Sequence, residues 1–332
     1  MAEFIKPKLT KNYNDELRHI GFEIEFSNID IEKTLNIFKK DFAFKVDKVN
    51  NYYYKLNSRY GEFVLELDFE LLTKQKLKKS AKEFFKTTGI EIDQEGIESV
   101  EEIIGDLSKD IVPYEIGTPP IQIDEVEIVE QIIEKLKQNN AKGTSHKFYY
   151  AFGLHLNIEV VSLEVKSLLS YMRSYVILQK FIDKDAKVDF TRKITPFIDK
   201  FEDDYIKYIL DKDYAPSIEK FIDDYLHFNP TRNRSLDMLP ILSFIDEQRV
   251  RKVLPDEKIK PRPAFHYRLS NSNIGEEGWS VWDEWNRWLI VEDLANDQDS
   301  LEELCSEYLK YLNEFIHIKS WEERTVKWLK SR

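Results

Sequence analysis

Two glutamates, Glu23 and Glu25, occupy alternate positions of the otherwise apolar segment HIGFEIEF at residues 19–26. Alternate side chains of an extended strand point to the same face, so the two carboxylates would lie side by side, with phenylalanine and isoleucine side chains on the opposite face. Like charges at this spacing repel each other, and a half-buried strand has no ordinary reason to carry them. The pair therefore indicates a function.

The same alternation recurs in four later segments that are typical of strands. Their polar positions hold acids, histidines, an asparagine and an arginine, and no lysine. Such side chains bind hard metal ions or clamp phosphate and carboxylate groups. The pattern predicts a metal-centred active site on the polar face; the alternative is an antiparallel sheet with one ordinary solvated face. The polar positions are Glu66 and Asp68 in VLELD, Glu115 in VPYEIGT, His155, Asn157 and Glu159 in GLHLNIE, and His266 and Arg268 in AFHYRLS.

The types of ligand indicate which ion and which chemistry to expect. Oxygen-rich ligand sets favour Mg²⁺ or Mn²⁺ over structural zinc, which prefers cysteine and histidine. Clustered divalent ions indicate chemistry on phosphate, because they neutralise the charge that develops in phosphoryl transfer. Arg232 and Arg234 in RNRSLDMLP, and Arg262 before the last strand, are candidates for phosphate binding. For Arg249 and Arg251 we favour surface ion pairs.

Composition narrows the classes of protein. The chain has 332 residues and a formal net charge of −12, which argues against a nucleic-acid binder or a protein of anionic membranes, since both need a basic face. The single cysteine, Cys305, fits a reducing compartment and is expected to be a buried filler rather than a nucleophile. No apolar run is long enough to span a bilayer, and no secretory signal is visible. We therefore expect a cytoplasmic protein.

Hydrophobic periodicity predicts an α+β fold in which short strands alternate with long helical stretches. No linker divides the chain, so residues 1–332 are expected to form a single catalytic domain. Capping boxes at Ser300 with Glu303 and at Ser320 with Glu323 would each open a C-terminal helix within about 299–331. Strands are expected at 20–26, 111–120, 150–160 and 261–274, and the segment 63–72 is expected to start as a strand, with continuation into a helix left open. Helices are expected within 74–110, 124–140 and 163–227.

Two apolar patterns locate parts of the core. The segment 124–140 carries a stripe at helical spacing, so its helix is expected to be amphipathic. Three tryptophans, Trp282, Trp285 and Trp288, are expected to be core anchors rather than a stack for a ligand. The stripe consists of Val126, Val129, Ile133 and Leu136.

Taken in order, GFEIEF, LELD, YEIGTPP, GLHLNI, RNRSLDMLP and FHYRLSN resemble the motifs of the amidoligase family. Its members are carboxylate–amine ligases related to glutamine synthetase and glutamate–cysteine ligase. The resemblance spans roughly residues 18–295, with 74–110 and 163–225 similar only as helical filler. It implies a glutamine synthetase-like, curved and mainly antiparallel sheet that forms a funnel, with helices on its outer face and a large helical insertion. It also implies ATP and two or three Mg²⁺ or Mn²⁺ ions.

The resemblance also implies a role for each polar residue. Glu23 and Glu25 would hold two different ions, which explains why the two charges tolerate each other. Glu115 would join Glu25 on the first ion, His155 would bind the second ion with Asn157 beside it, and Glu66 or Asp68 would be the acid of the second strand. Arg234 or Arg232 would bind phosphate or the substrate carboxylate, and Arg262 would be a further nucleotide contact. Arg268 would stabilise the transferred phosphoryl group.

One position departs from the family pattern. Relatives such as glutamine synthetase carry Glu-x-Arg on the last strand, where the glutamate is a metal ligand. Here the triplet is His266-Tyr267-Arg268. His266 would replace that ligand, contact a phosphate of the nucleotide, or mark a site with fewer ions.

The implied activity is ATP-dependent formation of an amide or isopeptide bond through an acyl phosphate. The substrates would be a carboxylate and an amine, each on a small molecule, a peptide or a protein, with no nucleic acid or membrane as partner. Two alternatives stay open. A metal-dependent phosphoesterase or other hydrolase would use the same carboxylates, and a degenerate nucleotide-binding module would have lost some of the ligands.

Overall fold

The computed structural model describes residues 2–67, 114–143, 152–186, 199–314 and 320–330. In these residues an open, nine-stranded antiparallel sheet is combined with helices, which confirms the α+β prediction. The strand order is β2-β3-β4-β5-β1-β7-β9-β8, and β6 pairs with β1 beside this path. The strands are β1 (His19–Phe26), β2 (Lys45–Lys48), β3 (Tyr53–Ser58), β4 (Gly61–Leu67), β5 (Tyr114–Gly117), β6 (Ile121–Gln122), β7 (Gly153–Glu159), β8 (Leu236–Asp237) and β9 (Ala264–Asn271).

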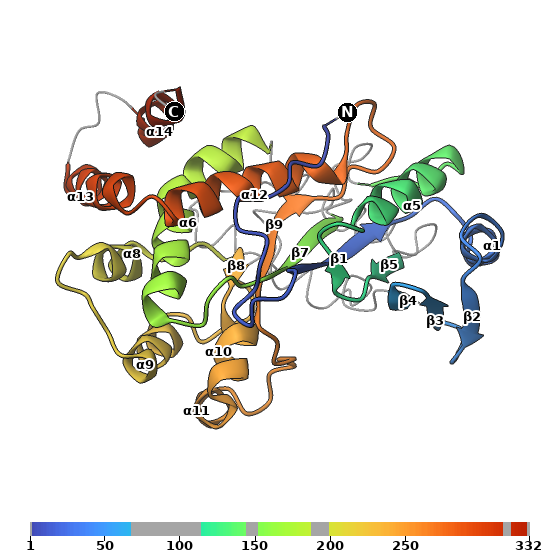
Figure 1. Cartoon of the computed structure of the whole chain (residues 1–332), viewed down its shortest axis with the longest axis horizontal. Helices are drawn as coiled ribbons and strands as arrows, with labels where there is room; N and C mark the ends of the chain where they lie inside the picture. The colour runs from blue at the N-terminus through green and yellow to red at the C-terminus, as the bar shows by residue number, and fades with distance from the viewer. Residues whose placement is uncertain (1, 68–113, 144–151, 187–198, 315–319, 331–332) are drawn as a thin grey trace, which may run out of the picture.

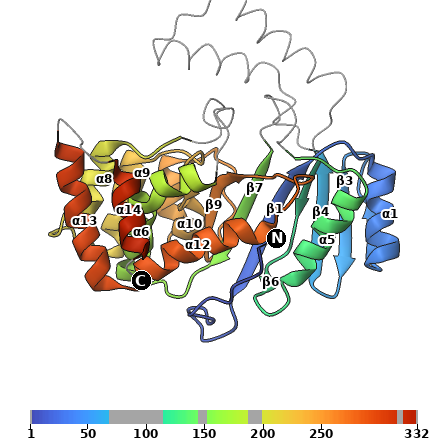
Figure 2. The same cartoon turned by 90° about the horizontal axis from the view of Figure 1, so that it is seen from above.

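Helices cover one side of this sheet. Figures 1 and 2 both place α5 and α12 over the same side of the strands, and α10 and α11 lie at the β8 end, below the sheet in Figure 1. None of the described helices is long and apolar enough to cross a membrane. The described helices are α1 (Ile31–Asp41), α5 (Glu127–Gln138), α6 (Val165–Asp185), α8 (Asp203–Leu210), α9 (Ile218–Phe228), α10 (Leu239–Ile245), α11 (Glu247–Val253), α12 (Val281–Ala295), α13 (Gln298–Asn313) and α14 (Trp321–Lys330).

The core lies between the apolar face of the sheet and these helices. Because strand side chains alternate, the central strands turn phenylalanine, leucine and isoleucine toward α12, α6 and α5. Phe22 of β1 meets the Trp282 ring edge-on, with 6.1 Å between ring centroids, and Phe265 of β9 lies 5.6 Å from Trp288. All three tryptophans of α12 are buried, as are the four predicted residues of the α5 stripe. Both core predictions are confirmed.

A buried ion pair fixes the start of β1 against α12. The Arg18 guanidinium donates to both carboxylate oxygens of Glu292, at 3.0 and 2.5 Å, and the Trp288 indole donates to the same carboxylate. Both charged side chains are almost fully buried, and paired charges of this kind are costly to break. The pair therefore helps to hold the central strand in position.

The five predicted strands correspond to β1, β4, β5, β7 and β9, whose bounds differ from the predicted ones by no more than three residues at the ends that can be compared. Residues 68–72 of the predicted segment 63–72 lie outside the described residues. The described parts of 163–227 carry α6, α8 and α9. The cap prediction at Ser300 is wrong: α13 begins earlier, at Gln298, and the Asp297 side chain accepts from the Ser300 backbone N–H. An acid three residues closer to the N-terminus therefore outcompetes the serine. Ser320 does accept from the Glu323 backbone. The predicted helix within 74–110 lies outside the described residues.

Candidate metal centre on the polar face of the sheet

The register of the central strands brings the predicted acids together in one row. Directly opposite residues of an antiparallel pair point to the same face. Glu25 of β1 is opposite Glu115 of β5, and Glu115 is in turn opposite Glu66 of β4. The three carboxylates therefore form a row on one face of the sheet, with one carboxylate on each of three neighbouring strands. The Gly153 backbone N–H donates to Glu25 at 2.6 Å, whereas Asp68 lies outside the described residues.

Two further rows lie beside the first on the same face. Glu23 is opposite His155 of β7, and Asn157 is opposite His266 of β9. His266 is also opposite Asp237 of β8, so this row extends to the end of the sheet. The polar face inferred from alternation is thus one continuous surface, and strand order decides which polar residues become neighbours.

Glu23 is the centre of a cluster with the chemistry of a metal site. Its Oε2 lies 3.0 Å from His155 Nδ1 and 4.0 Å from His266 Nε2, and its Oε1 accepts from Asn157 Nδ2 at 3.0 Å. Glu23, His155 and His266 each offer a ligand atom, and these atoms lie within 4.8 Å of one another. No other such group occurs in the described part of the chain. One carboxylate and two imidazoles suit a divalent ion.

Charge in the cluster is set by its surroundings. Burial disfavours ionisation of Glu23, but the imidazoles of His266 and His155 and the Asn157 amide outweigh it and hold the pKa of Glu23 well below its usual range. Burial, together with His155 and two nearby arginines, holds the pKa of His266 well below its usual range, although Glu23 acts in the other direction. At neutral pH the cluster therefore combines an ionised carboxylate with a neutral His266.

Arginines gather at the β9 and β8 end of the polar face. Arg262 donates to Asn157 Oδ1 through Nη2 at 2.5 Å and through Nε at 3.1 Å. Arg268 lies on the same face of β9 as His266 and donates to the backbone carbonyl of Arg232. Positive charge thus borders the cluster on this side, while the row of acids borders it on the other.

The predicted phosphate contact Arg234 does not join this group. Its buried guanidinium donates to the carbonyls of Lys200 and, at 3.4 Å, Phe228, and it lies 5.5 Å from the centre of the Phe201 ring. Arg249 and Arg251 of α11 form ion pairs with Asp223 of α9 and with Glu247 of α11, as expected for surface arginines.

Asp237 is a site residue that the prediction missed. It is buried opposite His266, and its Oδ1 accepts from the Leu239 backbone N–H at 2.9 Å. Burial raises the pKa of Asp237 to about 6, although three nearby arginines, led by Arg268, favour its charge. The signal was present in the sequence, since Ser235 and Asp237 alternate with Leu236 and Met238 in RNRSLDMLP.

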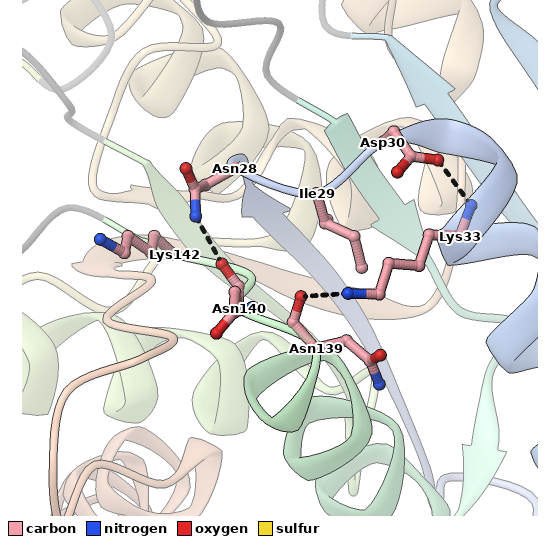
Figure 3. A pocket seen from close by; sticks show the side chains of 7 residues that line it. All are labelled: Asn28, Ile29, Asp30, Lys33, Asn139, Asn140 and Lys142. Carbon is pink, nitrogen blue, oxygen red and sulfur yellow. Dashed lines mark hydrogen bonds between the residues drawn. The ribbon is translucent and has the colours of Figure 1, made fainter.

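Two hollows contain none of these residues. The pocket in Figure 3, of about 310 Å³, lies where β1 leads into α1 beside the end of α5. Its polar groups bind one another: Asn28 donates to the Asn140 carbonyl and Lys33 to that of Asn139. We interpret this pocket as a structural contact between the β1–α1 connection and the end of α5.

The second hollow, of about 1250 Å³, lies between α6, α13 and residues 210–216. Cys305 lines it, and burial raises the pKa of this thiol to about 11. The thiol is therefore protonated at neutral pH, which fits the expected filler and not a nucleophile.

The chain was also compared with known proteins. A family model described as "putative amidoligase enzyme" matches residues 16–290. The match covers most of the chain and includes every described residue of the polar face named above. A search of curated proteins found no match.

Proposed function

Because the chain belongs to the amidoligase family, we propose that it joins a carboxylate to an amine in an amide or isopeptide bond and that ATP drives the reaction. The distribution of charge on the polar face is the observation that carries this proposal. Acids and histidines on β4, β5, β1 and β7 are followed by arginines on and beside β9. A metal-bound triphosphate requires both acids and arginines, since carboxylates bind the ions and arginine binds phosphate oxygens.

Two parts of the face would hold ions. Glu23, His155 and His266 have the donor chemistry for one, and the acids of the first row, Glu25, Glu115 and Glu66, offer oxygens for others. Bound Mg²⁺ or Mn²⁺ would neutralise phosphate charge during transfer. The arginines Arg262, Arg268 and Arg232 would bind the phosphate oxygens.

The proposed reaction has two steps. An oxygen of the substrate carboxylate attacks the γ-phosphorus of ATP, the bond to the bridging oxygen breaks, and ADP and an acyl phosphate are formed. The amine nitrogen then attacks the acyl carbon, phosphate leaves, and a carboxylate of the face accepts the amine proton. Arg268 would stabilise the transferred phosphoryl group, and the site as a whole would act by positioning the reactants and neutralising charge.

The test is release of phosphate from ATP in the presence of Mg²⁺ or Mn²⁺ by the full chain. Amino acids and acidic peptides whose amines are blocked are offered as carboxylate donors, polyamines as amine donors, and then the two pools together. We expect phosphate release only when both are present, together with a product whose mass equals the two substrates less one water. Glu23→Gln should abolish release, and Glu62→Gln, an exposed acid on the same face of β4, should not.

Other outcomes identify a different function. Phosphate release that does not depend on an amine would identify a hydrolase. Tight ATP binding without release under any combination of pools would identify a binding module.

A further inference from the structure

Asn157 has only one possible orientation in this site. Its Oδ1 lies 2.5 Å from Arg262 Nη2 and 3.1 Å from Arg262 Nε, and its amide nitrogen lies 3.0 Å from Glu23 Oε1. A guanidinium can only donate hydrogen bonds, and an ionised carboxylate can only accept them. The amide oxygen must therefore face Arg262, and the NH₂ group must face Glu23.

This orientation fixes the tautomer of His266. His266 Nδ1 lies 2.8 Å from the same Asn157 Oδ1, which is an acceptor, so Nδ1 must carry the proton. In a neutral imidazole the other nitrogen then keeps its lone pair. That nitrogen, Nε2, lies 4.0 Å from Glu23 Oε2, which is too long for a hydrogen bond. Nε2 is thus unprotonated and directed into the cluster, which suits a metal ligand and not a donor to phosphate.

We propose that Arg262 and Asn157 are positioning residues that hold His266 as an Nε2 ligand, so that Glu23, His155 and His266 form a centre that binds a transition ion such as Mn²⁺ or Co²⁺ in preference to Mg²⁺. Imidazole nitrogen suits transition ions, whereas Mg²⁺ prefers oxygen ligands and retains its waters. Hydrogen bonding to the second ring nitrogen orients a histidine ligand, and its loss weakens metal binding. The inference refines the proposed function by naming the ion, but it can be measured without turnover.

The first experiment measures metal binding by calorimetry on the chelator-treated full chain, without ATP, with Mn²⁺, Co²⁺ and Mg²⁺ titrated separately. We expect Mn²⁺ and Co²⁺ to bind at least about ten-fold more tightly than Mg²⁺. His266→Glu should bring the affinities for Co²⁺ and Mg²⁺ closer together, while His227→Glu, the same change at an exposed histidine on α9, should leave them unchanged. Equal affinities in the unaltered protein, or no effect of His266→Glu, would overturn the proposal.

The second experiment tests the positioning role directly. Nitrogen-15 NMR of the histidine rings distinguishes the two neutral tautomers. We expect His266 to carry its proton on Nδ1 in the metal-free protein, and Asn157→Ala to abolish this preference and weaken Co²⁺ binding about 10- to 100-fold. A proton on Nε2 in the unaltered protein would refute the inference.

The two proposals can fail separately. If the protein binds Mn²⁺ tightly but forms no amide, the metal centre proposed here is supported and the ligase function is refuted. If the protein forms the amide with Mg²⁺ and shows no preference among the ions, the ligase function is supported and the proposed metal preference is refuted.

Discussion

Glu23 and Asp237 are acids on the same face of the sheet, yet their surroundings act on them in opposite directions. Glu23 receives hydrogen bonds from an imidazole and an amide, which favour its charge despite burial. Asp237 is almost fully buried, and the desolvation of its charge outweighs the attraction of three arginines. The effect of a buried acid on stability therefore depends on its donors, and replacing each acid by its amide should show this.

Glu23→Gln should destabilise the metal-free protein by about 1 kcal/mol near neutral pH, because charge-assisted hydrogen bonds are lost. The folded-state pKa of Glu23 lies below the unfolded value, so its contribution is complete above about pH 4.5 and is lost as the pH falls toward the folded value. Urea unfolding in EDTA, at neutral pH and near pH 3, measures the difference. The two proteins should converge in acid; a variant more stable than the parent at neutral pH would contradict the prediction.

Asp237→Asn should have the opposite effect. The folded-state pKa, about 6, lies above the unfolded value near 4, so the parent protein loses stability as the pH rises through this window. Asparagine keeps an acceptor for the Leu239 N–H and carries no charge, so above pH 6 it should stabilise the fold by up to about 3 kcal/mol. Urea unfolding at about pH 5 and pH 8 measures this. If Asp237→Asn does not stabilise the fold at pH 8, the arginines fully compensate the charge of Asp237.

At the level of elements, the β1–β7 pair sets the geometry of the centre. Gly21 of β1 is directly opposite Asn157 of β7, and a Cβ atom at Gly21 would lie 3.3 Å from the Asn157 Cβ. This is tighter than ordinary contact, so the two strands approach closely where Asn157 contacts Glu23, His266 and Arg262. A glycine at this position therefore serves the site as well as the sheet.

Gly21→Ala should keep the fold, cost about 1 kcal/mol through overpacking, and weaken Mn²⁺ binding by displacing Asn157. Gly117→Ala is the matched control. Gly117 of β5 is directly opposite Glu23 of β1, and a Cβ atom at Gly117 would meet nothing within 4 Å. Calorimetry and thermal melts should separate the two variants. Equal effects on Mn²⁺ affinity would show that the contact at Gly21 does not position Asn157.

On the scale of the whole molecule, charge decides what can approach the polar face. The chain carries a formal net charge of −12, and four glutamates of this face lie on three adjacent strands. A triphosphate is repelled by such a surface unless cations lie between them. In the described part of the chain, the arginines that border this face, Arg262 and Arg268, lie on the side formed by β9 and β8.

Removal of divalent ions should therefore abolish ATP binding. We expect calorimetry to detect ATP binding with Mn²⁺ or Mg²⁺ and no heat in EDTA, and the metal-dependent rise in melting temperature to disappear in EDTA as well. Excess Mn²⁺ added after EDTA is the control, and it should restore both signals. Undiminished affinity for ATP in EDTA would contradict a metal-centred site.

The sequence alone determined which residues share a face. Side-chain alternation is a local property of an extended chain, so Glu23, Glu115, His155 and His266 could be assigned to the polar face before any strand was placed. The apolar stripe of α5 and the tryptophans of α12 were predictable for the same reason. Helix starts depend on competition between neighbouring residues, and there the prediction failed at Ser300, where Asp297 forms the cap.

Only the tertiary structure decided which polar residues meet. Strand order and register depend on how distant apolar faces pack, and no local pattern encodes them. Packing placed β7 between β1 and β9, and so brought Asn157 between Glu23 and His266. It also buried Asp237 and bound Arg234 to backbone carbonyls away from the cluster. Chemistry at this site requires atoms a few ångströms apart, and contacts between distant segments of the chain set those distances.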